Sequence, residues 1–232
     1  MKIENWKLNL LFTILFGLLV YFGFKKFVIS PRQVKIIKGV INQPHLINPL
    51  YAELNPVDKE ISDLLFRGLV KYDKQGNIIG DLAENWEISE DGKVYTFNLK
   101  PNLTWHDKER FRAEDIVFTI QLAQEADYQG PEKGSFTGVT VEKIDEQKVK
   151  FILKEPFAPF LDRLTLGILP KHKLFEVSVK DLTKDEFNLN PIGTGSWQFS
   201  GLKLNPATKT ISSLTLSPVT SYHPPAGGPI TS

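Results

Sequence analysis

Histidine, cysteine, serine and paired carboxylates are the side chains from which most catalytic and metal sites are built. The chain has no cysteine, so thiol nucleophiles, disulfides and cysteine-ligated zinc are excluded. Its four histidines, His45, His106, His172 and His223, form neither a His-Glu-x-x-His motif nor a close cluster. We expect His106 and His172 to be turn and surface residues without a catalytic or metal-binding role.

Two further patterns could carry chemistry. The Gly-Thr-Gly-Ser run at 193–196 lacks the strand-to-helix setting of a nucleophile elbow and continues into Trp197. The acidic pairs Glu114-Asp115 and Asp185-Glu186 are typical of helix first turns and solvated faces. No phosphate-binding loop of the G-x-x-x-x-G-K-S/T type is present. The sequence therefore predicts no enzyme, no cofactor and no metal site, and favours a binding or structural module.

Composition predicts a folded body with a sizeable core. The 232 residues are 41% hydrophobic, which is enough for one large core or two small ones. The 28 basic side chains nearly cancel the 27 acidic ones. Because binding to a nucleic-acid backbone requires a cationic excess, a nucleic-acid partner is not expected.

The first helix of this body is expected to begin at Asn55-Pro56, which places Asn at the N-cap and Pro at the first helical position. Apolar residues then recur at helical spacing and predict a core-facing stripe that extends to about Gly68. The residues of this stripe are Val57, Ile61, Leu64, Leu65 and Leu69.

Two hairpins and a second helix follow. Residues 86–88 and 94–99 alternate around Asp91-Gly92, which is a strong hairpin pattern. Residues 140–144 and 149–153 indicate a second hairpin, and Ala113 to Gln124 indicate a helix. Strands and helices are mixed without a regular βαβ alternation, so we predict a mixed α/β (α+β) fold.

The N-terminus indicates a membrane segment. Residues 8–24 are almost wholly apolar and are flanked by Lys7, Lys25 and Lys26, which predicts an uncleaved transmembrane helix. Positive charge after the segment would by itself place the body inside the cell. The strand-like run Val34 to Ile41 should begin the folded body.

The C-terminal end has a different composition. From Pro206 onward the chain is rich in Ser, Thr, Pro and Gly and has Lys209 as its only charge. We expect this tail not to order itself, because it has too little apolar surface to bury.

Several segments, in order and spacing, resemble the family 5 extracellular solute-binding proteins, a group that includes the oligopeptide and dipeptide binders of ABC importers. The most specific is Gly80 to Lys100, which contains Leu82-Ala83-Glu84-Asn85-Trp86-Glu87 and Tyr95-Thr96-Phe97. The other segments are Ile47 to Leu50, Leu65 to Asp73, Trp105 to Asp107, Ala113 to Thr119, Lys154 to Leu161, Ile168 to His172 and Asn190 to Trp197.

The sequence departs from the family pattern at three places. Lys108-Glu109 stands where the family has a turn glycine, and Ser196-Trp197 replaces Pro-Tyr. Arg112 replaces a Thr helix cap, which should weaken that helix start by about 1 kcal/mol.

The resemblance implies a periplasmic-binding-protein type II fold of two lobes, of which this chain would be an N-terminal fragment with the second lobe mostly missing. Residues 1–33 would be the anchor and link. Residues 34–70 and 157–200 would form lobe one, and residues 71–156 a subdomain attached to it. Residues 201–232 would begin a truncated second lobe.

The resemblance also implies a function, namely extracytoplasmic binding of peptides or similar small solutes for an ABC permease, with the body outside the cell membrane. We expect Ala52, Glu53, Leu54 and Trp197 to face the solute cleft, although Glu53 could be a solvated loop acid and Trp197 part of the lobe-one core. Gly193 and Gly195 are expected to supply backbone freedom near the crossover between lobes. The alternative is a membrane-tethered, non-catalytic interaction module or a non-functional fragment.

Overall fold

The computed structural model describes residues 42–219, which lie within one compact unit. The predicted membrane segment at 8–24 and the predicted strand at 34–41 lie outside the described residues. Between residues 42 and 219, no helix is both long and apolar enough to cross a membrane.

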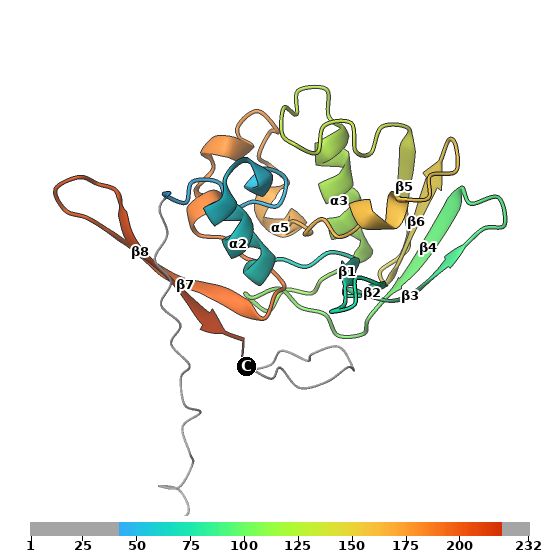
Figure 1. Ribbon diagram of the computed structural model, residues 1–232, viewed down its shortest axis with the longest axis horizontal. Coiled ribbons are helices and arrows are strands. Elements are labelled where there is room, and N and C mark those ends of the chain that lie inside the picture. Colours follow the sequence, from blue (N-terminus) through green and yellow to red (C-terminus); the bar gives the residue numbers. More distant parts are fainter. Residues whose placement is uncertain (1–41, 220–232) are drawn as a thin grey trace, which may run out of the picture. The chain divides into compact units, whose positions relative to one another are not determined.

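Short helices and antiparallel strands make up the described chain (Figure 1). In chain order they are η1 (Ala52–Leu54), α2 (Pro56–Leu65), β1 (Val70–Tyr72), β2 (Ile78–Gly80), β3 (Ala83–Ile88), β4 (Val94–Leu99), α3 (Ala113–Gln124), β5 (Val139–Asp145), β6 (Lys148–Leu153), α4 (Phe160–Arg163), α5 (Lys171–Leu174), η2 (Leu182–Lys184), η3 (Glu186–Leu189), β7 (Trp197–Leu204) and β8 (Ile211–Pro218).

Within residues 42–219 the largest sheet has four antiparallel strands in the order β3-β4-β6-β5. It is built from the two predicted hairpins, which are confirmed. In the first, Ile88 pairs with Tyr95 and Gly92 has a φ of 66°, the left-handed conformation that favours glycine. The central pair β4–β6 joins the hairpins through partners such as Phe97 and Val149.

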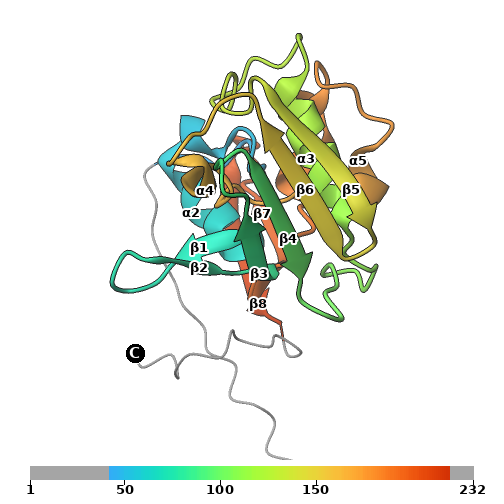
Figure 2. The same cartoon turned by 90° about the vertical axis from the view of Figure 1, so that its right-hand side faces the viewer.

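One face of this sheet is buried and the other is solvated. Every second residue of β4 and of β6 is buried, as expected for strands with a single core-facing side. Helix α3 contacts β5 and β6 across the buried face (Figure 2). Further along the chain, α4 adds Phe160, whose ring lies 4.9 Å from that of Tyr95 and 5.5 Å from that of Phe151.

Helix α2 begins where the sequence predicted. The Asn55 side chain accepts a hydrogen bond from the Val57 N–H, and Pro56 is the first helical residue. The helix ends at Leu65, three residues before the predicted end at Gly68. Leu64 was wrongly placed on the core-facing stripe: its side chain is 43% exposed, whereas Leu65 is fully buried.

Helix α3 has the predicted bounds, but its start is capped differently from what the sequence suggested. Arg112 has no acceptor side chain, and the Asp115 carboxylate instead accepts a hydrogen bond from the Arg112 N–H at 2.9 Å. Asp115 lies in the first turn of the helix, as the sequence predicted, but it is buried there, with only 4% of the residue exposed.

The expectation that the chain stays unordered from Pro206 onward was also wrong for its first part. Residues 211–218 form β8, which pairs antiparallel with β7 from Trp197 to Leu204. Leu214 and Leu216 are partly buried and pack against the core. Backbone pairing with β7 thus orders a segment whose composition alone predicted no order. Residues 220–232 lie outside the described chain.

Candidate functional site

The run 193–196 lies against the C-terminal end of α2. The Gly195 N–H donates a hydrogen bond to the Leu65 carbonyl oxygen at 2.7 Å. A Cβ atom on Gly193 would lie 1.9 Å from the Leu65 carbonyl oxygen, and one on Gly195 would lie 2.2 Å from that of Leu64. Only glycine fits at either position.

This finding corrects the role predicted for the two glycines. The positive φ angles among the described glycines occur at Gly76, Gly92, Gly134 and Gly138, so neither Gly193 nor Gly195 uses the left-handed conformation. The two glycines are required because two stretches of backbone touch, and not because the chain there needs unusual conformational freedom.

His106 holds the same run from the other side. Its backbone N–H donates to the Gly193 carbonyl oxygen at 2.9 Å. Its ring accepts from the Gly193 N–H through Nδ1 at 3.1 Å, and its Nε2 lies 3.1 Å from the Gly195 carbonyl oxygen. Burial lowers the pKa of the His106 ring below its ordinary value. The expectation that His106 is a turn and surface residue therefore missed its contact with the glycine run.

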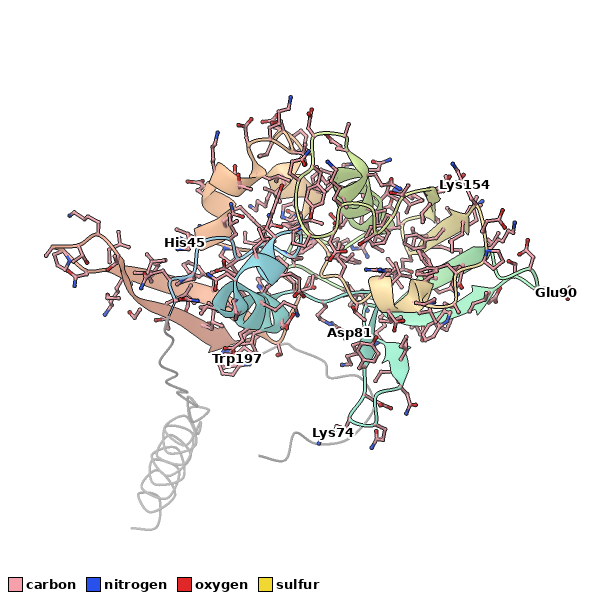
Figure 3. All side chains as sticks on the ribbon, turned by 45° about the horizontal axis from the view of Figure 1, so that its top comes forward. His45, Lys74, Asp81, Glu90, Lys154 and Trp197 are labelled. Carbon is pink, nitrogen blue, oxygen red and sulfur yellow. The ribbon has the colours of Figure 1, made fainter. Side chains whose placement is uncertain are left out.

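Trp197, labelled in Figure 3, follows this run directly and is the first residue of β7. It is partly buried and pairs with Pro218 of β8. The adjoining Ser196 carbonyl oxygen accepts a hydrogen bond from the Val219 N–H at 2.9 Å. Strand β7 and Trp197 therefore begin directly after the run that contacts α2 and His106.

The other predicted cleft residues lie beyond the opposite end of α2. Ala52 is 1% exposed and belongs to the core, whereas Leu54 is 64% exposed. Glu53 is exposed, and one of its carboxylate oxygens lies 3.7 Å from the Lys59 ammonium. Ten helical residues separate η1 from the glycine run, which corresponds to about 15 Å at 1.5 Å per residue. Gly193, Gly195 and Trp197 are near neighbours in the sequence and lie at the C-terminal end of α2, whereas residues 52–54 precede its N-terminal end. Contact of these residues with a solute stays a prediction.

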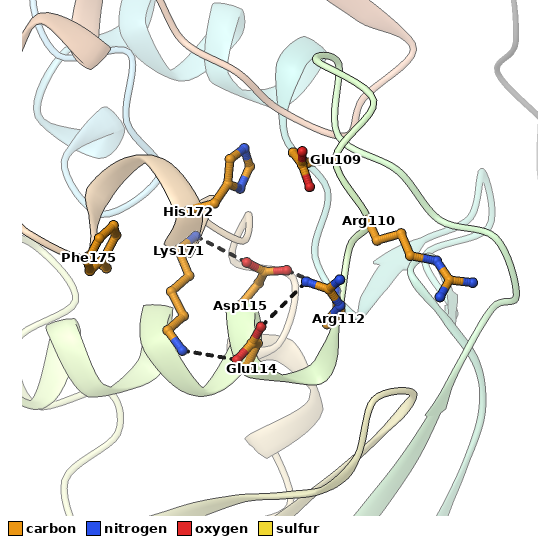
Figure 4. Close-up of a pocket in the computed structure, with 8 residues that line it drawn as sticks. All are labelled: Glu109, Arg110, Arg112, Glu114, Asp115, Lys171, His172 and Phe175. Carbon is orange, nitrogen blue, oxygen red and sulfur yellow. Dashed lines mark hydrogen bonds and ion pairs between the residues drawn. The ribbon is translucent and has the colours of Figure 1, made fainter.

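A small polar hollow lies near the start of α3 (Figure 4). Its volume is about 160 Å³, below the roughly 300 to 1,000 Å³ typical of small-molecule sites. The Lys171 ammonium pairs with Glu114 at 3.0 Å, and the Lys171 N–H donates to Asp115 at 3.1 Å. Within this lining the Glu114 carboxylate therefore pairs with the Lys171 ammonium and lies 3.7 Å from the Arg112 guanidinium. The residues that line the hollow are Glu109, Arg110, Arg112, Glu114, Asp115, Lys171, His172 and Phe175.

Asp115 beside this hollow has a structural role that the sequence did not reveal. Its carboxylate accepts hydrogen bonds from the N–H groups of Arg112 and Lys171 and, at 3.4 Å, from the Trp105 indole. Burial raises the pKa of Asp115 above its ordinary value, an effect larger than the lowering by these donors. The only hint in the sequence was the lack of a capping side chain at Arg112. Among residues 42–219, no group of three or more His, Asp or Glu side chains could hold a metal ion.

Comparisons with known proteins point to one family. Residues 77–222 match the family model described as bacterial extracellular solute-binding proteins, family 5 Middle. The oligopeptide-binding protein AppA of Bacillus subtilis is 34% identical over 185 residues, which are 77% of this chain and 34% of that protein. The dipeptide-binding protein of Escherichia coli is 38% identical over 157 residues, which are 58% of this chain and 29% of that protein. The chain thus spans about a third of the length of these relatives.

Solved structures give the same result. The structure of Bacillus subtilis AppA in complex with a nonapeptide superposes with a TM-score of 0.68 at 32% identity, over 75% of this chain and 35% of that one. NikZ of Campylobacter jejuni in complex with Ni(L-His) gives a TM-score of 0.63 at 34% identity, over 72% of this chain and 32% of that one. The chain therefore belongs to the family 5 bacterial extracellular solute-binding proteins.

Proposed function

We propose that this chain supplies one wall of the cleft in which a solute receptor captures peptides, or solutes of similar size, for delivery to an ABC permease. The observation that carries the proposal is the likeness to AppA over 75% of the chain, because that structure holds a nonapeptide. The second wall would come from a second lobe that closes over the solute by a hinge motion. The lining of the cleft would include exposed residues before α2 and the start of β7.

The exposed side chains of Glu53 and Leu54 and the partly buried Trp197 suit a surface of this kind. Leu54 and Trp197 offer apolar area, and Glu53 offers a carboxylate that can pair with the amino group of a peptide. Receptors that hold a peptide backbone as an added strand leave its side chains in roomy pockets, which gives broad specificity.

The proposal is tested in a chimera in which residues 42–219 replace the matching region of Bacillus subtilis AppA. Calorimetry with a nonapeptide should give micromolar or tighter binding. Trp197→Ala should weaken binding by about tenfold, in the range of a contact residue in an interface. Lys184→Ala, at an exposed position on η2, is the matched control and should leave the affinity unchanged. A chimera that folds, by circular dichroism, but binds no peptide would contradict the proposal.

The isolated 232-residue chain should bind the nonapeptide no tighter than millimolar, because a single wall leaves most of the peptide in water. Micromolar binding by the isolated chain would contradict the two-wall arrangement. Titration of the chimera with Ni(L-His), the ligand in the NikZ structure, tests the other solute class. Tighter binding of the nickel complex than of the peptide would reject peptides as the solute.

We propose further that the body lies outside the cytoplasm and is held at the membrane by residues 8–24. The apolar run with its lysine flanks and the family membership support this placement. Protease added to spheroplasts should then digest the body while cytoplasmic markers stay intact. Protection of the body until the inner membrane is lysed would place it in the cytosol and reject an import role.

A further inference from the structure

The hydrogen bonds of His106 define the protonation state of its ring. The Gly193 N–H donates to Nδ1, so Nδ1 carries no proton. Nε2 faces the Gly195 carbonyl oxygen, which can only accept, so Nε2 carries the proton. The two bonds together require a neutral imidazole protonated on Nε2.

A second proton on the His106 ring, which would be bound to Nδ1, would be unfavourable in this environment. It would convert Nδ1 into a donor that faces the Gly193 N–H, and that hydrogen bond would be replaced by a contact between two donors. Burial and the nearby Lys108 both lower the pKa of the ring, while the Gly195 carbonyl and Asp107 raise it. Residues 193–195 and the apolar end of α2 behind them contribute no ionisable side chain.

On the side that faces His106, residues 193–195 have few other hydrogen bonds to fix their position. Thr194 is 6% exposed, and its hydroxyl has no hydrogen-bond partner among the described residues. Two backbone hydrogen bonds also hold the run, one from the Gly195 N–H to the Leu65 carbonyl oxygen and one from the His106 N–H to the Gly193 carbonyl oxygen. Protonation of the ring removes the Nδ1 contact with the Gly193 N–H and leaves these bonds and the Nε2 contact in place.

We infer that His106 is a positioning residue that holds residues 193–195 most firmly while its ring is neutral, and that its protonation removes one hydrogen bond and loosens the run leading into Trp197 and β7. The inference deepens the proposed function, and one of its consequences rests on that function: if the start of β7 lines the solute cleft, its loosening should weaken solute binding at acidic pH. The stabilisation is present above the ordinary histidine pKa and is lost as the pH falls through the lowered pKa of the folded protein.

Hydrogen exchange detected by mass spectrometry tests, without any solute, whether the His106 ring stabilises residues 193–195. In the wild-type chain, protection of peptides covering 193–199 should fall as the pH is lowered from 7.5 to 5, after correction for intrinsic rates. The fall should approach about fivefold, the loss expected for one hydrogen bond, as the ring becomes fully protonated. Protection of α3 and of the β3–β4 hairpin should not change. His106→Gln, which keeps a donor but does not titrate, should show reduced protection of 193–199 that is the same at both pH values.

His172→Gln is the matched control. His172 is bonded to Asp107 and does not touch the glycine run, so this variant should keep the full pH response at 193–199. An equal pH response in wild type and His106→Gln would overturn the inference, and so would its loss in His172→Gln.

If His106→Gln fails to fold, nitrogen NMR of the wild-type ring decides the matter. A neutral ring with the proton on Nε2 at pH 7.5 is expected, and a proton on Nδ1 would overturn the inference. Failure of the chimera to bind peptide while the exchange response persists would reject the proposed function and leave the role of the His106 ring standing.

Discussion

At the scale of single residues, the two glycines before Trp197 are required for a different reason from the one that the sequence suggested. The sequence indicated Gly193 and Gly195 as positions that need backbone freedom. The structure shows ordinary φ angles and backbone atoms too close for any Cβ. The sequence Gly-Thr-Gly is compatible with a need for conformational freedom and with a close approach of two backbones. Only the distance to α2 distinguishes these two explanations.

Gly195→Ala should therefore destabilise the protein. The added Cβ would lie 2.2 Å from a backbone oxygen, which cannot swing aside as a side-chain end could, so we expect a loss of about 2 to 3 kcal/mol. Urea unfolding gives this value. Gly201→Ala is the control, since a Cβ there meets nothing within 4 Å, and it should change stability by less than about 0.5 kcal/mol. Equal effects of the two substitutions would refute the steric explanation.

Lys108→Gly should stabilise the protein. Lys108 has a φ of 75°, where a side chain costs about 1 to 2 kcal/mol, and the family pattern has a glycine at this turn. After the greater entropy of glycine in the unfolded chain is subtracted, the net gain should be about 0.5 to 1 kcal/mol. Thermal unfolding should show a higher Tm. Lys74→Gly, at a residue without positive φ, should give no gain, and a lower Tm for Lys108→Gly would contradict the argument.

At the scale of elements, local patterns determined most boundaries. Alternation around Gly92 predicted the first hairpin, and apolar spacing predicted α3 from Ala113 to Gln124. What the local pattern missed is how α3 starts. The cap comes from Asp115 inside the first turn, and the same carboxylate binds the first residue of α5.

Asp115→Ala should consequently affect two elements at once. It would leave the N–H groups of Arg112 and Lys171 without their acceptor in a buried place, for an expected loss of about 2 to 4 kcal/mol. Denaturant unfolding measures the loss, and hydrogen exchange should increase at both α3 and α5. Glu114→Ala removes a half-exposed ion pair from the same turn and should cost less than about 1 kcal/mol. Similar losses for the two variants would mean that Asp115 is not the shared cap.

At the scale of the whole molecule, one hydrophobic core runs through residues 47–187. Phe160, expected in lobe one, packs its ring on Tyr95 and Phe151 of the predicted subdomain. The Leu169 N–H also donates to the Thr119 hydroxyl at 2.9 Å, which joins the same two regions. The division into lobe one and subdomain stays a prediction, and these contacts should couple its two parts.

The body should accordingly unfold in one transition. Tryptophan fluorescence and far-UV circular dichroism, followed through the same urea titration, should give the same midpoint. Phe160→Ala should lower that midpoint for both probes together, because the ring belongs to the shared core. Two separated midpoints would show that the predicted subdomain is independently stable.

The sequence by itself determined the family, both hairpins, the start of α2 and the extent of α3, because turn residues, caps and apolar spacing act between near neighbours. Only the tertiary structure decided that the His106 ring bonds to Gly193, 87 positions away, that Asp115 is buried, and that β8 is ordered. Each of these depends on a partner that is distant along the chain, and no local pattern of residue types encodes which distant backbone group a side chain will meet.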